Sequence, residues 1–167
     1  MFEVPHYHYQ IKEWTNLKRK VMSSLKVREP EKVPNTIDCS ITTSYWDTFD
    51  FTEYGDFLTM VQPYVANVPN VSQVTRVWFQ TSSQNDFHSA HNHGSIGWSA
   101  VFYADFNPDV HVPTKFYCPF SNVTGNIDVF CPNVEEGDLI IFPASVLHEA
   151  PINTSNTPRT IISFNLF

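Results

Sequence analysis

The sequence predicts a mainly β protein, a sandwich or jelly-roll barrel, with two helices in its N-terminal part. Three observations support this prediction. Aromatic residues are abundant (14 Phe, 7 Tyr and 4 Trp), there are 12 prolines, and charged residues make up only 16% of the chain, which favours a compact β-rich fold. A helical period of apolar residues occurs only before about residue 70. From residue 73 onward, short strand-like segments follow one another with turn residues between them.

The two helical patterns span residues 10–26 and 55–66. The first pattern has an apolar stripe with spacings of three or four residues, formed by Ile11, Trp14, Leu17, Val21 and Leu25. Pro63 falls inside the second pattern and weakens it, because proline removes a helical hydrogen bond. We expect both helices to pack on one face of the β core.

The strand-like segments are residues 36–46, 73–81, 87–93, 98–106, 112–120, 127–131, 138–142 and 160–167, and residues 1–10 predict a short strand or an ordered arm. No repeat, linker or low-complexity tract separates these segments. We therefore expect one domain over residues 1–167, in which 1–70 form a helical support and 71–167 form the β core.

Charge and cysteine content exclude several classes of function. With 10 basic and 17 acidic residues the net charge is −7, which makes a nucleic-acid partner an unfavourable interpretation because such proteins need a basic face. The three cysteines, Cys39, Cys118 and Cys131, are odd in number and far apart. No signal peptide and no membrane-spanning run are visible. We expect a cytoplasmic protein with reduced thiols and no membrane partner.

Three of the seven histidines lie within six positions, as His88, His91 and His93. Residues two apart on a strand point to the same side, so His91 and His93 are expected to project together and to offer two ligands to one metal ion. His88 is three residues before His91 and is expected on the opposite face unless the strand bends. It is a reserve metal ligand.

The best third ligand is His148, which follows the apolar segment Gly137–Pro143 at or just past a strand end. Imidazoles suit Zn, Cu, Fe and Ni. Three protein ligands leave positions open for water or substrate, as in catalytic metal sites. His111, in contrast, follows a turn signal and is expected at the surface.

Arg159 opens the last apolar strand, among Thr160, Ile161 and Ile162. An arginine buried there without an anion would be costly, and its planar fork matches a carboxylate. We therefore expect an anion pocket beside the metal. The alternative is a salt bridge at the rim with one of the spare acids, which are Glu135, Glu136, Asp138 and Glu149.

These stretches also carry a resemblance to a family. The order His91-Asn92-His93-Gly94-Ser95, Gly137-Asp138-Leu139-Ile140-Ile141-Phe142-Pro143, His148, Arg159 and Ile162-Ser163-Phe164-Asn165 resembles the Fe(II)/2-oxoglutarate-dependent dioxygenases. It is most similar to a subgroup of small 2-oxoglutarate oxygenases found in phages and marine bacteria. The resemblance covers roughly residues 74–167. It implies a double-stranded β-helix, or jelly roll, with the two helices on one face.

The resemblance implies an enzyme that hydroxylates a C–H bond with Fe(II), 2-oxoglutarate and O2. His91, His93 and His148 would hold the iron, and Arg159 would bind the far carboxylate of 2-oxoglutarate; together these four form the expected catalytic set. Tyr103 or Asn165 would add a hydrogen bond to the cosubstrate. The primary substrate would be a small molecule or a peptide, with a homodimer as a further option and the host cytoplasm as the location if a virus encodes the chain.

One position departs from the family pattern, because most members have a carboxylate where this chain has His93. Three options remain open: His93 is a ligand, a water or halide fills the place, or His88 replaces His91 or His93. We favour the first. Ile161 also stands where Ser or Thr is common. Two other functions compete with the oxygenase: a cupin-like metal-binding protein without 2-oxoglutarate, and a jelly-roll binding or structural module without catalysis.

Overall fold

The computed structural model describes residues 4–27, 31–33, 39–45 and 53–167. They form helices α1 (Trp14–Val27) and α2 (Gly55–Val65) and strands β1 (Tyr7–Gln10), β2 (Glu31–Val33), β3 (Cys39–Thr43), β4 (Val74–Ser82), β5 (Phe87–His91), β6 (Trp98–Asp105), β7 (Lys115–Ser121), β8 (Ile127–Phe130), β9 (Asp138–Pro143), β10 (His148–Ala150) and β11 (Arg159–Leu166). The prediction of a mainly β fold with two N-terminal helices is confirmed. No described helix is both long and apolar enough to cross a membrane.

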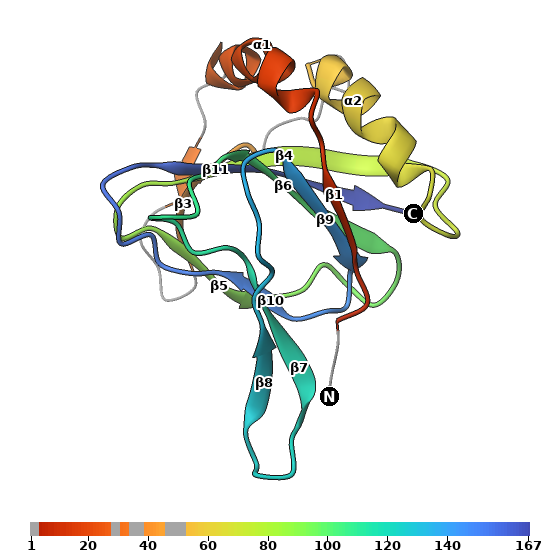
Figure 1. Cartoon of the computed structure of the whole chain (residues 1–167), viewed down its shortest axis with the longest axis vertical. Helices are drawn as coiled ribbons and strands as arrows, with labels where there is room; N and C mark the ends of the chain where they lie inside the picture. Colours follow the sequence, from red (N-terminus) through yellow and green to blue (C-terminus); the bar gives the residue numbers. More distant parts are fainter. Residues whose placement is uncertain (1–3, 28–30, 34–38, 46–52) are drawn as a thin grey trace.

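The strands form one antiparallel sheet that curls over into two layers (Figure 1). The first layer has the order β1-β9-β6-β11-β4, and the second has the order β5-β10-β7-β8. Strand β3 belongs to both, because Thr42 and Thr43 pair with β4 while Cys39 and Ser40 pair with β5. This is the expected jelly roll, curled into a half-barrel whose interior lies between the layers.

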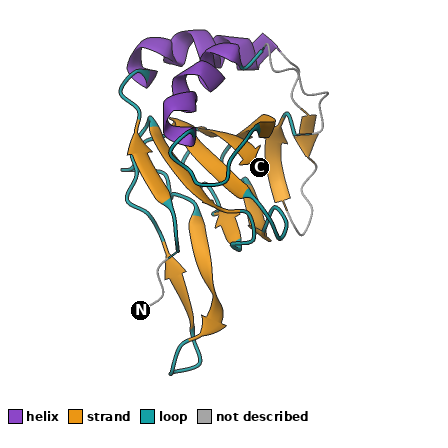
Figure 2. Ribbon diagram, turned by 90° about the vertical axis from the view of Figure 1, so that its right-hand side faces the viewer, coloured by secondary structure: helices purple, strands orange, loops and turns teal. Residues whose placement is uncertain are grey.

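Alternation along the strands of the first layer sorts their side chains between two cores. Phe102 and Phe164 face outward and meet Phe57 of α2 in the larger core. Their strand neighbours face inward, and Tyr103 joins Phe116 of β7 in the core between the layers. Both helices cover the outer face, as predicted (Figure 2). The inner face is therefore the one left for polar chemistry.

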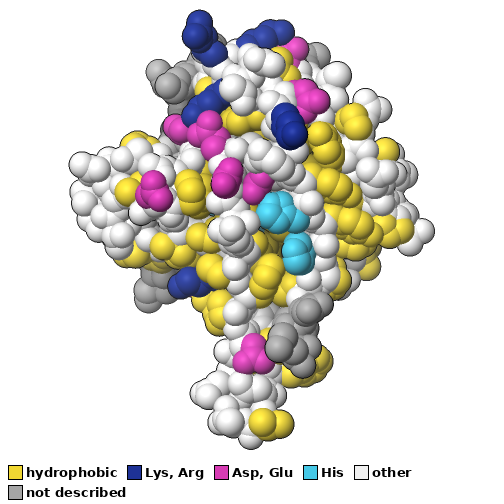
Figure 3. All heavy atoms as spheres, viewed as in Figure 1, with side chains coloured by type: hydrophobic (Ala, Val, Ile, Leu, Met, Phe, Trp, Pro, Cys, Tyr) yellow, Lys and Arg dark blue, Asp and Glu magenta, His cyan; other side chains and the backbone are white. Residues whose placement is uncertain are grey.

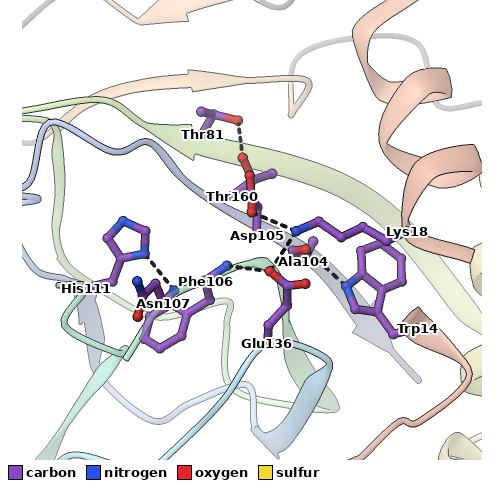
Figure 4. A network of polar contacts seen from close by, with 10 residues as sticks. All are labelled: Trp14, Lys18, Thr81, Ala104, Asp105, Phe106, Asn107, His111, Glu136 and Thr160. Carbon is purple, nitrogen blue, oxygen red and sulfur yellow. Dashed lines mark hydrogen bonds and ion pairs between the residues drawn. The ribbon is translucent and has the colours of Figure 1, made fainter. Parts of the chain in front are cut away.

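A polar network fastens α1 to the first layer (Figure 4). The ammonium group of Lys18 contacts Asp105 at 2.8 Å and Glu136 at 2.7 Å. Glu136 also accepts a hydrogen bond from the backbone of Phe106, and the indole N–H of Trp14 donates to the carbonyl of Ala104 at 3.1 Å. Lys18 thus holds α1 on the first layer through two ion pairs.

The hairpin formed by β7 and β8 projects from the body of the protein (Figures 1 and 2). Its far end exposes apolar side chains, with Phe120 exposed by 71% and Val123 fully exposed. Apolar side chains are visible at the end of this projection in Figure 3. Strand β8 pairs only with β7 in the described part of the chain, so the hairpin is also the end of the second layer.

Several sequence predictions need correction. The segment 36–46 contains β3, while its residues 36–38 and Trp46 lie outside the described residues. Strands β2 and β10 are additional, and β10 is the strand that carries His148. The expectation that His111 is at the surface was wrong. Its side chain is 6% exposed and its two ring nitrogens bond to Asn107 and Thr157 (Figure 4 shows the first bond).

Candidate metal centre

Three histidines from two neighbouring strands and the following loop converge between the layers. His148 of β10 is paired directly with His91 of β5, and His93 follows two residues later. One ring nitrogen of each of the three lies within 4.8 Å of those of the other two. The structure thus brings together the three residues that the sequence singled out as metal ligands.

The Nδ1 atom of each of these rings is already engaged. His91 donates from Nδ1 to the carbonyl of Ser89 at 2.7 Å, and His148 donates to the carbonyl of Val146 at 2.9 Å. His93 donates to the side-chain oxygen of Asn165 at 3.1 Å. Acceptors at Nδ1 fix the proton there and leave the lone pair of each Nε2 free. Metal-binding histidines usually have this arrangement.

His93 reaches the cluster from a loop, because β5 ends at His91 and the predicted strand 87–93 is therefore too long. The backbone N–H of His93 donates to the carbonyl of Ala144, whose own N–H donates to Gly97. Gly97 has a φ of +85°, and a Cβ there would lie 2.6 Å from the carbonyl of Leu166. Only glycine permits this close loop, which holds His93 in place.

His88 lies beside the cluster because the strand is irregular. The register shift between His148 and Ala150 places two residues of β5, Ser89 and Ala90, opposite the single residue Glu149 of β10, as in a β-bulge. Because the strand is bent here, His88 lies on the same side as His91 and not on the opposite face. Its ring stacks on that of His91 with centroids 3.8 Å apart. The amide nitrogen of Gln80 lies 3.0 Å from its Nδ1. An amide donor there places the proton of His88 on Nε2, the opposite arrangement to the other three.

Burial keeps these imidazoles neutral. Burial, followed by repulsion from His91 and His93, lowers the pKa of His88 to about 3. The same two kinds of cause lower the pKa of His93 to about 4 and that of His148 well below its ordinary value. Burial also lowers the pKa of His91. Neutral imidazole is the form that binds a metal ion.

Arg159 is buried, with an exposed fraction of 4%. Its Nη1 donates to the carbonyl of Val112 at 2.5 Å. No acidic side chain forms an ion pair with it among the described residues, and three of the four spare acids pair elsewhere: Glu136 with Lys18, Asp138 with His8 and Glu149 with Lys115. Burial lowers the pKa of Arg159. The rim salt bridge is therefore not found in the described part of the chain, and the guanidinium lacks the anion that its burial calls for.

Tyr103 and Asn165 occupy different places around the cluster. Tyr103 is fully buried near Arg159, its hydroxyl accepts a hydrogen bond from the backbone of Thr114, and burial raises its pKa to about 12. Asn165 accepts from His93 and from Ser99, both at 3.1 Å. Asn165 thus orients the ring of His93, one of the candidate metal ligands.

Two residues around the site were not identified from the sequence, Gln80 and Ser99. Both belong to strands whose alternate residues face the interior, and both line the small cavity between the layers. Gln80 lies two residues after Trp78 on β4, and Ser99 is paired with Asn165. The alternation of residues along β4 and β6 could have shown that Gln80 and Ser99 face the interior. It could not have shown which side chains they contact there.

Two cavities meet at the histidine cluster. One is a pocket of about 370 Å³ whose walls include Trp78 and residues of β3. The other is a small cavity between the layers, lined by Thr114, Phe142, His148 and Ser163. His88, His91 and His93 line both. A metal ion held by the cluster would therefore face an open pocket on one side and an enclosed space on the other.

A family model described as "Putative 2OG-Fe(II) oxygenase" matches residues 76–165, which is more than half of the sequence. The chain belongs to this family. It is an oxygenase that depends on Fe(II) and 2-oxoglutarate and uses O2. This membership decides against a cupin-like protein without 2-oxoglutarate and against a module without catalysis. No curated relative matches the oxygenase in sequence.

Solved structures share the fold of the oxygenase at low sequence identity. A prolyl-4-hydroxylase from Pseudomonas putida has 14% identity and a TM-score of 0.69, covering 98% of this chain and 92% of that one. The epimerase SnoN of nogalamycin biosynthesis has 10% identity and a TM-score of 0.72, with coverages of 98% and 78%. HygX from Streptomyces hygroscopicus has 9% identity and a TM-score of 0.72, with coverages of 98% and 82%. These likenesses establish the jelly-roll fold.

Proposed function

We propose that the oxygenase holds Fe(II) through His91, His93 and His148 and hydroxylates a C–H bond of its primary substrate. In this reaction 2-oxoglutarate, O2 and the substrate give succinate, CO2 and the hydroxylated product. One oxygen atom enters succinate and the other enters the new hydroxyl group. The bound iron supplies the activation of O2, and the protein supplies the binding and the orientation.

The arrangement of the three imidazoles is the observation that carries this proposal. Each Nδ1–H has an acceptor, no Nε2 has a hydrogen bond to another described residue, and burial keeps the rings neutral. Such a set fits Fe(II), and three protein ligands leave positions open for the cosubstrate. Of the three options for the second ligand, we keep His93. His88 fits less well, because the amide of Gln80 engages its Nδ1 and leaves a proton on Nε2.

Arg159 is proposed to bind the far carboxylate of 2-oxoglutarate. A buried guanidinium without an acidic partner in the described residues is matched by a bidentate carboxylate. Tyr103 lies close enough to Arg159 to oppose the lowering of its pKa by burial, and its hydroxyl is proposed as a further donor to that carboxylate. Asn165 accepts from His93 and is proposed to offer its amide N–H groups to the cosubstrate side.

The substrate is proposed to be a small molecule or a residue of a peptide. Both kinds occur among proteins of this fold: one structure of HygX contains hygromycin B, and a prolyl hydroxylase from Trichoplax adhaerens was solved with a peptide fragment. Cys118 and Cys131 are free thiols, which fits a proposed cytoplasmic location. A homodimer and a division into a support (1–70) and a core (71–167) remain part of the proposal.

The proposed function is tested by turnover of 2-oxoglutarate to succinate. Succinate formation should require Fe(II) and should be lost in His148→Ala and Arg159→Ala. His8→Ala and Arg19→Ala are matched controls, because they remove a histidine and an arginine outside the cluster, and they should keep the activity. Purified protein that binds no divalent metal in stoichiometric amount would overturn the proposal.

A further inference from the structure

The larger cavity at the cluster has a wall made by alternate residues of β3 and its continuation. Cys39, Ile41, Thr43 and Tyr45 line this side, and Trp78 and Gln80 of β4 line the next. Residues two apart on a strand share a face, which is why four residues of one short segment reach the same pocket. His91 and His93 also line it.

No charged side chain is among the described residues that line this pocket. Arg76 contacts one of the residues of the wall, since its guanidinium carbon lies 4.6 Å from the centre of the Tyr45 ring. Arg76 does not itself line the pocket. Its guanidinium group packs against the ring of Tyr45 instead. The anion site proposed at Arg159 is a separate place, because Arg159 is not among the residues that line this pocket.

The polar groups of the pocket are neutral, and several are already engaged. The hydroxyl of Thr43 donates to the carbonyl of Phe79 and accepts from the backbone of Tyr45. The side-chain oxygen of Asn165 accepts two hydrogen bonds. Asn92 and Asn165 keep amide N–H groups that have no partner among the contacts of the described residues, so the pocket can donate to one or two neutral acceptors.

The charge of the metal centre with iron and 2-oxoglutarate bound also gives no preference for a charged substrate. Three neutral histidines add no charge to a divalent ion, and the two carboxylates of 2-oxoglutarate cancel that of the ion. A site with one protein carboxylate would be more negative by one unit and would attract a cationic substrate more strongly. A charged group placed against Ile41 and Trp78 would lose its hydration without gaining an ion pair.

We propose that the primary substrate presents an uncharged, largely apolar group to this pocket, with at most one or two hydrogen-bond acceptors near the target C–H bond. This inference rests on the proposed function. A pocket of about 370 Å³ is within the range of small-ligand sites. The group could come from a free neutral molecule or from an uncharged peptide residue, and the same chemistry would recognise both.

The test uses the full-length protein with Mn(II) and 2-oxoglutarate in the absence of O2, followed by calorimetric titration with matched probes. Indole is compared with indole-3-acetate and tryptamine, and N-acetyl-leucine N-methylamide is compared with free leucine. The neutral member of each set should bind at least about tenfold more tightly, because the charged members are desolvated without a partner. The two sets distinguish a free molecule from a peptide residue.

Lysine variants test whether the probe binds in this pocket. Ile41→Lys adds a cation to the wall and should weaken binding of the neutral probe that wild-type protein prefers while strengthening binding of indole-3-acetate. Val129→Lys, at a residue of β8 that is 49% exposed, is the control and should leave the probe preference unchanged. If Ile41→Lys does not fold, Cys39→Lys makes the same change at a half-buried position of the same wall.

The outcomes separate this inference from the proposed function. Failure of Mn(II) or 2-oxoglutarate to bind contradicts both. If both bind but the charged probes bind as tightly as the neutral ones, or no neutral probe binds at millimolar concentration, the inference alone is overturned. An unchanged probe preference in a folded lysine variant would also overturn it, because the probe would then occupy another place.

Discussion

The ring of His88 lies flat against the ring of His91, with centroids 3.8 Å apart and planes 18° apart. Because Gln80 holds the other edge of His88, the His91 ring is fixed on one face by this stack and at Nδ1 by the carbonyl of Ser89. His88 thus positions His91, one of the proposed metal ligands. The partners of a ligand typically change metal affinity by about 10–100-fold when they are removed.

Replacing His88 separates positioning from ligation. We expect His88→Ala to weaken Mn(II) affinity by about tenfold, because it frees the face of His91. His88→Phe retains a flat ring and should keep most of the affinity. The measurement is a calorimetric titration of metal-free protein with Mn(II), with His8→Ala as the histidine control. Equal losses in His88→Ala and His88→Phe would mean that His88 is itself a ligand.

The contact between Asn165 and His93 gives a second prediction. Asn165→Ala removes the acceptor of the His93 Nδ1 proton and should weaken Mn(II) affinity by about tenfold or more. Ser99→Ala leaves that acceptor in place and should have a smaller effect. Both variants are compared by the same titration. Wild-type affinity in Asn165→Ala would contradict the proposal that His93 is a ligand oriented through Asn165.

Arg159 should control affinity for 2-oxoglutarate through the shape of its guanidinium. Arg159→Lys keeps the charge but loses the bidentate fork, and we expect the KM for 2-oxoglutarate to rise by about tenfold or more. Arg159→Met should raise it by about 100-fold or more. Added 2-oxoglutarate should raise the melting temperature of metal-loaded wild-type protein but not that of Arg159→Met.

The control for the arginine series is Arg19→Met, an exposed position on α1, which should keep the wild-type KM. A purely structural Arg159 would give a different pattern. The variants would then lose thermal stability, yet 2-oxoglutarate would still raise their melting temperatures as it does for wild-type protein.

The lowered pKa values predict how acid affects the metal-free protein. The pKa of His88 is about 3 and that of His93 about 4 in the folded state, against an ordinary value of 6.5. Below about pH 6.5 the unfolded chain binds protons that the folded chain does not, so the free energy of unfolding should fall as the pH drops from about 6.5 toward 4. Each histidine contributes at most about 1.4 kcal/mol per pH unit.

Urea unfolding of metal-free protein from about pH 7 to about pH 5 measures this dependence. His88→Phe removes one of the shifted groups and should show a shallower decline than wild-type protein. The other titrating groups are common to both proteins, so the difference between their slopes reports on His88. Identical slopes would mean that burial does not hold this imidazole neutral.

The ion pairs of α1 predict that Lys18 contributes more than Lys20 to the free energy of unfolding. Lys18→Met breaks ion pairs with Asp105 and Glu136 and should lower the free energy of unfolding by about 1 kcal/mol, since its side chain is only 33% exposed. Lys20→Met breaks one pair with Asp56 at 68% exposure and should cost less. Urea unfolding compares the two, and equal effects would contradict a structural role for the network.

Much of the fold could be predicted because its signals are local. The succession of short strand-like segments with turn residues between them predicted a sandwich or jelly roll, and the stripe that includes Trp14 and Val21 predicted α1 and its buried face. Strand β10 was missed because it has only three residues, His148–Ala150, and its pairing partners are distant in the chain. Short strands depend on such partners more than on their own sequence.

The sequence by itself determined the candidate metal ligands, His91 and His93 two apart and then His148, and the candidate anion-binding residue, Arg159, in an order that resembles the family. The tertiary structure decided how they are used. A register shift stacks His88 on His91, a glycine-dependent loop brings in His93, and Asn165 and Gln80 impose opposite proton positions on neighbouring rings. The physical reason is that tautomer, burial and ring orientation depend on groups far away in the sequence, which meet only when the sheet curls.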